Sequence, residues 1–165
     1  MNSDLEKTFV DFFKPNQRLI HKICRIYTDN TEDHEDLFQE ITIQLWKSFP
    51  GFKGDAKFST WMYRVALNTA ITLFKKPQKK ELKQSEVDFS TLKIEYEAYE
   101  DDEYKLKKMY LAIYQLSDIE KALIMMYLED KPYREIGEIL GITEGNARVK
   151  MNRAKNNLKQ KINAG

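Results

Sequence analysis

The chain has 165 residues, of which 42% are hydrophobic and 32% are charged. That length suits one domain or two small ones, and the hydrophobic fraction excludes a wholly disordered chain. Cys24 is the only cysteine, which excludes an internal disulfide and a metal site built from several cysteines. No apolar run reaches about eighteen residues, and the first residues lack the apolar stretch of a secretion signal. We therefore expect a cytoplasmic protein.

The net charge of +1 hides an uneven distribution along the chain. Residues 1–80 hold 13 Lys and Arg against 10 Asp and Glu, residues 81–103 hold 2 against 9, and residues 104–165 hold 12 against 7. An acidic middle of −7 thus separates segments of +3 and +5. This pattern indicates two basic parts joined by an acidic one.

Residues 1–76 are predicted to form a helical unit. Apolar residues recur at helical spacing in four stretches, which are Leu5 to Phe13, Leu19 to Tyr27, Leu37 to Leu45 and Trp61 to Phe74. Pro50 and Gly51 break the third stretch from the fourth. Asp36, just before the third stretch, and Gln39 and Glu40 within it lie opposite its apolar stripe. Acidic residues near a helix start complement its dipole, but this face could equally meet a basic partner protein.

Between residues 52 and 64, aromatic rings alternate with cations. The rings of Phe52, Phe58 and Trp61 are interleaved with Lys53, Lys57 and Arg64. Rings can stack on unpaired bases for roughly 1–3 kcal/mol each while cations follow the phosphates, so the cluster favours single-stranded nucleic acid as a ligand. Burial in a core is the simpler explanation for any single ring, Trp61 included.

From residue 77 to residue 103 the sequence is polar and acidic, and it has too few apolar residues for a core. We predict a flexible linker there. Helical periodicity resumes at Tyr104, and Ser117 with Glu120 predicts a capping box at the start of the next helix. Together with the two helices described next, residues 104–165 are predicted to form a four-helix domain.

Residues 133–155 predict a helix-turn-helix. Gly141 follows a short amphipathic helix, where a positive φ commonly ends a helix, and Thr143 is a predicted N-cap for the next one. Gly137 would let the second helix approach the first closely. That second helix has a buried stripe, predicted at Ala147, Met151, Ala154, Leu158 and Ile162, and an exposed polar face with Asn146, Arg148, Lys150, Arg153 and Lys155. These donors suit phosphates and guanine edges, whereas a helical hairpin with a solvated basic face is the plainer alternative.

The sequence carries no enzyme motif that we can identify. His21 and His34 are the only histidines, and neither belongs to an HExxH pattern. There is also no Walker-type glycine loop and no GxSxG. We therefore expect no enzymatic activity, no cofactor, no metal and no small-molecule substrate.

With both halves considered, the chain resembles the extracytoplasmic-function (ECF) sigma factors, the smallest group of bacterial promoter-recognition subunits of RNA polymerase. DHEDLFQEITIQLW at 33–46 is similar to the family's region 2.2, residues 52–71 are similar to regions 2.3 and 2.4, and residues 116–158 are similar to region 4. The resemblance implies an all-α fold, with a region 2 bundle at 1–76 and a region 4 four-helix domain at 104–165, joined by the acidic linker at 77–103.

The resemblance also implies roles for individual residues. Asp36, Gln39 and Glu40 would face the β′ clamp coiled coil of core RNA polymerase, and region 4 would meet the β flap. The minus-10 promoter element would be read and melted, without nucleotide hydrolysis, by Phe52, Lys53, Lys57, Phe58, Trp61, Arg64 and Asn68. The minus-35 element would be read by Glu144, Asn146, Arg148, Lys150 and Arg153. The linker would thread the polymerase channel used by template and transcript, and an anti-sigma factor is an implied partner.

Three positions depart from the family's pattern. Val149 stands where a small hydroxyl residue is common, Lys150 where arginine is common, and Gly137 where alanine is common. Because lysine lacks arginine's bidentate fork, the upstream sequence preference is not carried over from the family. A stand-alone helix-turn-helix regulator, with residues 1–76 as a sensor or dimerisation domain, is the alternative function. A module that only sequesters another protein would leave the basic helix unexplained.

Overall fold

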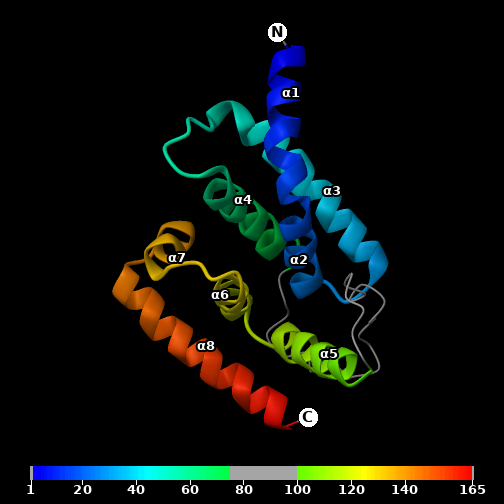
Figure 1. Ribbon diagram of the computed structural model, residues 1–165, viewed down its shortest axis with the longest axis vertical. Coiled ribbons are helices and arrows are strands. Elements are labelled where there is room, and N and C mark those ends of the chain that lie inside the picture. Colours follow the sequence, from blue (N-terminus) through cyan, green and yellow to red (C-terminus); the bar gives the residue numbers. More distant parts are fainter. Residues whose placement is uncertain (1, 75–99, 165) are drawn as a thin grey trace.

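The computed structural model describes residues 2–74 and 100–164. The described residues are almost entirely helical, in two groups of helices that lie before and after residues 75–99 (Figure 1). This confirms the predicted all-α class with two small helical units. Residues 77–99 of the predicted linker lie outside the described residues, and its last four residues form the start of the helix from Glu100.

The first unit contains the four predicted helices, which are α1 (Asn2–Phe13), α2 (Gln17–Tyr27), α3 (Thr31–Ser48) and α4 (Phe58–Leu73). Short 3-10 turns, at Lys14–Asn16 and at Phe49–Gly51, follow α1 and α3. Asn30 begins α3, because its side-chain oxygen accepts a hydrogen bond of 2.8 Å from the Asp33 amide. The core lies between α2, α3 and α4, where the fully buried side chains include Ile20, Ile23, Leu37, Ile41, Leu45, Met62 and Tyr63.

The second unit consists of α5 (Glu100–Tyr114), α6 (Asp118–Leu128), α7 (Tyr133–Leu140) and α8 (Glu144–Ala164). Ser117 and Glu120 form the predicted capping box at the start of α6. Residues 121–126 of α6 are all buried, so this helix lies at the centre of the unit. The last helix, α8, is longer than α6 and α7 and packs along both of them (Figure 1).

The two units contact each other through α4 with α7 and through α2 with α5 and α6 (Figure 1). The Tyr27 hydroxyl donates a hydrogen bond of 2.7 Å to the carbonyl oxygen of Asp118, and Lys22 forms an ion pair of 2.7 Å with Glu129. These polar contacts link residues that are far apart in the sequence. The short helix α7 also lies directly against α4, the helix that carries Trp61 and Arg64.

Among the helices in the described ranges, none is both long and apolar enough to cross a membrane.

Candidate nucleic-acid and polymerase interfaces

The turn between α7 and α8 is built as the sequence predicts. Gly141 ends α7 in the left-handed region, at φ 71°, where glycine has no steric penalty. The Thr143 hydroxyl accepts a hydrogen bond of 3.1 Å from the Asn146 amide and so caps α8. A Cβ added at Gly137 would lie 2.7 Å from the carbonyl oxygen of Ile142. The close approach of the turn to α7 therefore depends on glycine at position 137.

The outer face of α8 carries the residues predicted to contact the upstream promoter element. Ala147, Met151 and Ala154 are fully buried, so the helix is oriented by this seam. Leu158 and Ile162, the last two residues of the predicted stripe, are only half-buried. On the remaining surface, Glu144, Asn146, Arg148 and Arg153 are exposed, while Lys150 is half-buried. All five predicted residues thus lie on one helix, and four of them are open to a ligand.

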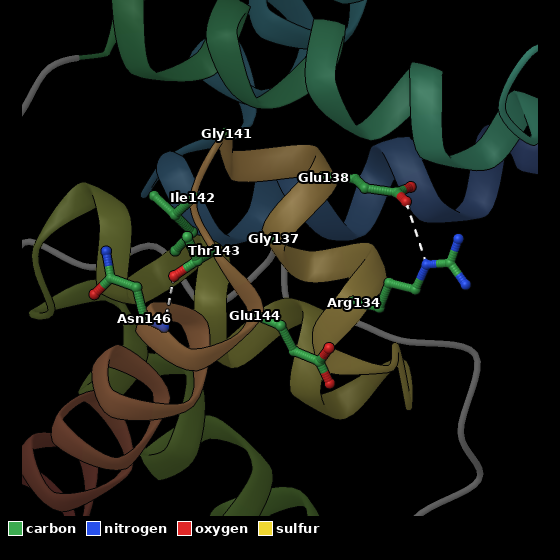
Figure 2. Close-up of a pocket in the computed structure, with 8 residues that line it drawn as sticks. All are labelled: Arg134, Gly137, Glu138, Gly141, Ile142, Thr143, Glu144 and Asn146. Atoms are coloured by element: carbon green, nitrogen blue, oxygen red, sulfur yellow. Dashed lines mark hydrogen bonds and ion pairs between the residues drawn. The ribbon is translucent and has the colours of Figure 1, made fainter.

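An open pocket of about 560 Å³ lies at this turn (Figure 2). Its walls come from α7, the turn and the first residues of α8, with Arg134, Gly137, Glu138, Gly141, Ile142, Thr143, Glu144 and Asn146 as lining residues. Arg134 pairs with Glu138 at 3.7 Å along α7. Charged residues of both signs stand among the lining residues and the pocket is open to solvent, so it is a hollow in the α7–α8 surface rather than an enclosed ligand cavity.

The predicted aromatic cluster is present in the first unit, around the loop after α3 and the start of α4. The centroid of the Trp61 ring lies 5.2 Å from that of Phe52 and 5.4 Å from that of Phe58. Phe58 is only 7% exposed and belongs to the core, whereas Phe52 and Trp61 are half-buried. Burial in the core therefore explains Phe58. Phe52 and Trp61 keep part of their rings at the surface, as contact with nucleic acid would require.

Phe12 of α1 extends this cluster and was not identified as a site residue from the sequence. Its ring lies 5.0 Å from that of Phe58 and 6.0 Å from that of Phe52, between centroids, and it is 40% exposed. In the sequence Phe12 belongs to the apolar pattern of the first helix, which predicts a core residue. Nothing in that pattern indicates a contact with residues forty or more positions later.

The polar residues predicted to read the minus-10 element differ in their contacts within the protein. Lys53, Lys57 and Asn68 are exposed. Arg64 is also exposed as a residue, but its guanidinium donates a hydrogen bond of 2.5 Å to the carbonyl oxygen of Glu138 in α7. One predicted minus-10 residue is thus engaged by the helix-turn-helix unit.

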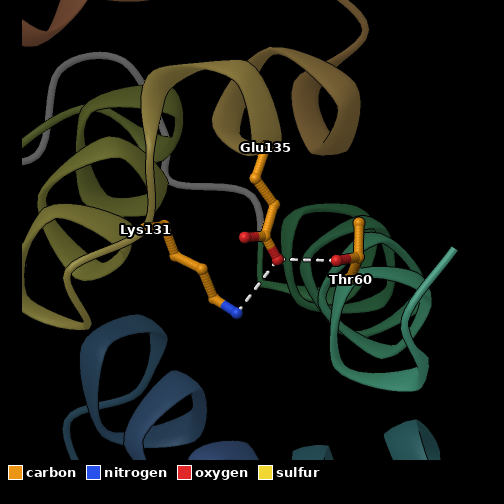
Figure 3. Close-up of polar contacts among 3 residues, drawn as sticks. All are labelled: Thr60, Lys131 and Glu135. Carbon is orange, nitrogen blue, oxygen red and sulfur yellow. Dashed lines mark hydrogen bonds and ion pairs between the residues drawn. The ribbon is translucent and has the colours of Figure 1, made fainter.

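Beside Arg64, a second polar contact joins α4 to α7 (Figure 3). The carboxylate of Glu135 accepts a hydrogen bond of 2.6 Å from the Thr60 hydroxyl and one of 3.1 Å from the Lys131 ammonium. Burial alone would raise the pKa of Glu135, but these hydrogen bonds and the positive charges of Lys131 and Lys57 outweigh it and lower the pKa. Glu135 is therefore held as a carboxylate between the two units.

The residues predicted to bind polymerase lie on α3. Asp36 and Gln39 are exposed, and half-buried Glu40 accepts a hydrogen bond of 2.9 Å from Gln44. Ile43 and Trp46 of the same helix are 38% and 37% exposed. Neither residue was predicted from the sequence as part of this surface. Their spacing could have indicated exposed positions, because both lie off the buried stripe of Leu37, Ile41 and Leu45.

The two histidines and the cysteine lie outside these surfaces and are buried or half-buried. His21 and His34 lie with ring nitrogens 2.9 Å apart, and burial, followed by the charges of His21 and Arg25, lowers the pKa of His34 to about 4. Burial raises the pKa of Cys24 to about 12. In the described part of the chain, His, Cys, Asp and Glu side chains form no group of three that could hold a metal ion.

Two family models match the two units in order. The model of sigma-70 region 2 matches residues 12–80, and the model of sigma-70 region 4 matches residues 106–158. The chain belongs to the sigma-70 family. Its relatives include the ECF RNA polymerase sigma factor SigW of Bacillus subtilis, which is 26% identical over 98% of this chain and 90% of SigW. With both regions in order and relatives of this kind over nearly the whole chain, it is an ECF sigma factor, which confirms the resemblance seen in the sequence.

Another relative is the ECF RNA polymerase sigma-E factor of Haemophilus influenzae, which is 26% identical over 79% of this chain and 75% of its own length. Two solved structures share the fold of this sigma factor. CnrH, solved in complex with the cytosolic domain of CnrY, matches 96% of the chain and 90% of its own, with a TM-score of 0.70 and 15% identity. RpoE from Bartonella quintana, solved with the anti-sigma factor NepR, matches 95% and 98%, with a TM-score of 0.66 and 14% identity.

Proposed function

We propose that this ECF sigma factor binds core RNA polymerase, recognises the minus-35 and minus-10 promoter elements through separate surfaces, and promotes opening of the promoter. The proposal rests on one observation. The part of the chain that matches sigma-70 region 4, which follows the match to region 2, contains a helix-turn-helix whose basic face is open to a ligand. Catalysis, a cofactor and a small-molecule substrate have no part in this function. The protein would act in the cytoplasm, with the polymerase.

The outer face of α8 is the proposed reader of the minus-35 duplex. A helix that follows a helix-turn-helix turn fits the major groove, and its first residues meet the base edges. Glu144, Asn146 and Arg148 occupy the first two turns of α8, and Lys150 and Arg153 follow. Amide and guanidinium donors match adenine and guanine edges, and the cations also match phosphates.

The surface around the loop at 52–57 and the outer side of α4 is the proposed reader of the minus-10 strand. Extruding a base from a duplex costs a few kcal/mol, which a pocket and stacking can offset. The half-buried rings of Phe52 and Trp61 present aromatic surface, and Phe58 supports them from the core. Lys53, Lys57, Arg64 and Asn68 would follow the strand, so opening would rest on capture of the melted strand without nucleotide hydrolysis.

This proposal places Arg64 at the contact between the two units. One of its N–H groups donates to the carbonyl oxygen of Glu138 and holds the side chain against α7, so fewer of its five donors face a promoter strand while the contact persists. The Thr60–Glu135 hydrogen bond lies at the same contact between α4 and α7. We therefore expect the two units to separate at this contact when the protein assembles with polymerase and promoter.

The exposed side of α3 is the proposed contact with polymerase. Asp36, Gln39 and Glu40 would meet the β′ clamp coiled coil, and the unit formed by α5 to α8 would meet the β flap. An anti-sigma factor is a further proposed partner, since the structurally similar RpoE was solved with one.

Run-off transcription with purified core polymerase tests the function directly. Addition of this chain should produce initiation at defined promoters that core polymerase alone does not use. A stand-alone helix-turn-helix regulator would instead bind an operator tightly without polymerase and would support no such initiation. That second result would overturn the proposal.

A further inference from the structure

Arg148 is held differently from the other cations predicted to read the minus-35 element. Its Nη2 donates a hydrogen bond of 2.9 Å to Oε1 of Glu144, and its Cζ lies 4.6 Å from the centroid of the Tyr133 ring. Within the described residues, neither Lys150 nor Arg153 makes a hydrogen bond or an ion pair. Arg148 therefore has a defined position before any DNA is bound.

The two groups that hold Arg148 come from different helices. Glu144 lies one turn earlier on α8, where residues four apart are neighbours. Tyr133 is the first residue of α7 and reaches Arg148 because the two helices cross closely at Gly137. The position of the guanidinium thus depends on the geometry of the whole helix-turn-helix and not on α8 alone.

This arrangement suits recognition because it orders an exposed side chain in advance. A free arginine side chain loses considerable rotamer entropy when it binds. A ring beneath the guanidinium attracts it through its quadrupole, and the Glu144 carboxylate draws it to one side. A guanidinium has five N–H donors, and those that Glu144 does not use remain able to donate to guanine O6 and N7.

We propose that Tyr133 is a positioning residue which, together with Glu144, orients Arg148 to read one base pair of the minus-35 element. This inference rests on the proposed function and adds a specificity determinant that lies on α7, outside the recognition helix. Tyr133 acts through Arg148 and needs no contact with a base. Glu144 would then act at least as much by holding Arg148 in place as by contacting the DNA.

The experiment measures base preference position by position. Holoenzyme, formed from the full chain and core polymerase, selects duplexes from a pool randomised over the upstream element. The wild type is compared with Arg148→Ala, Tyr133→Leu, Tyr133→Phe and the double variant Tyr133→Leu/Arg148→Ala. Tyr104→Leu is the matched control, because Tyr104 is 67% exposed and lies on α5, outside the helix-turn-helix formed by α7 and α8. The melting temperature of each variant is recorded.

Arg148→Ala should reduce the preference at one base pair by roughly 5- to 150-fold. Tyr133→Leu should reduce it at the same base pair by about two- to fivefold, and Tyr133→Phe should preserve it because the ring is retained. In the Arg148→Ala background, Tyr133→Leu should have no further effect. Tyr104→Leu should match the wild type throughout.

Two results would overturn the inference while leaving the proposed function intact. One is an Arg148→Ala effect that Tyr133→Leu does not share. The other is a Tyr133→Leu loss that is spread over all positions, persists without Arg148, or follows a lowered melting temperature, since each indicates a structural role. No change with Arg148→Ala would instead refute the assignment of Arg148 in the proposed function, and the inference would fail with it.

Discussion

The two surfaces proposed to read the promoter differ in how ready they are for DNA. The face of α8 is open, and its key cation is already held in position by Tyr133 and Glu144. On α4, by contrast, Arg64 is occupied by the carbonyl oxygen of Glu138, and Thr60 is bonded to Glu135. A duplex reader can be complete in the free protein because its target is always formed. A reader of melted strand has its target only after opening, and here its surface is partly covered by the other unit.

The largest expected effect comes from disrupting the turn that supports the open surface. Gly137→Leu would force a side chain against the Ile142 carbonyl oxygen, which lies 2.7 Å from the position of an added Cβ. Overpacking against backbone should lower the free energy of unfolding by about 3 kcal/mol and abolish binding to the upstream element. Chemical denaturation of the full chain measures the loss. Gly145→Leu is the matched control, because an added Cβ there meets nothing within 4 Å; an equal loss there would show that the close approach is unimportant.

Trp61→Ala should impair the strand-reading surface without affecting the duplex-reading one. Removing a base-stacking ring should weaken promoter opening by roughly 1–3 kcal/mol, while formation of the closed complex should change little. Permanganate reactivity of thymines in the melted region, compared with filter binding of the closed complex, separates the two steps. Equal losses in both steps would contradict the assignment of Trp61 to the melted strand.

On the duplex-reading side, Arg153→Ala tests a cation that is not held by neighbours. Loss of a contact to phosphate or base should weaken binding of holoenzyme to a promoter duplex by about 1–2 kcal/mol and leave association with core polymerase unchanged. Titration of labelled core polymerase provides the control. A loss of core association in this variant would contradict the assignment of polymerase binding to α3 and of promoter binding to α8.

The smallest expected effect concerns the carboxylate that joins the two units. Because the pKa of Glu135 is lowered in the folded protein, the folded state binds fewer protons there than the unfolded state. Its stabilising contribution is therefore complete at neutral pH and is lost as the pH falls below the ordinary carboxyl range. Glu135→Gln should cost about 1 kcal/mol at pH 7, and this difference should shrink towards pH 3.

Unfolding measured in urea between pH 7 and pH 3 checks the prediction for Glu135. The difference between wild type and Glu135→Gln is the quantity to follow, since it removes the other carboxyl groups from the comparison. A difference that stays constant over this range would show that the charge of Glu135 does not stabilise the contact between α4 and α7.

Much of each unit could be predicted from local patterns. The capping box of Ser117 and Glu120, the left-handed Gly141 and the Thr143 cap all depend on residues within a few positions of each other. The buried seam of α8 follows from helical periodicity. The boundaries were less accurate: α4 begins at Phe58 rather than Trp61, and α5 begins at Glu100 rather than near Tyr104. At α5 the reason is that the first turn is entirely polar and carries no apolar signal.

The sequence by itself determined the two helical units, the helix-turn-helix and the family, since each depends on spacing along one segment. Only the tertiary structure decided how free each predicted residue is. Thr60 and Glu135 are 75 positions apart, and Arg64 and Glu138 are 74 apart, so no periodicity links them. The contact of the Arg148 guanidinium with the Tyr133 ring likewise depends on the crossing of α7 and α8, where the chain passes close to Gly137. A residue type predicts what a side chain can bind, but its neighbours in space decide whether it is available.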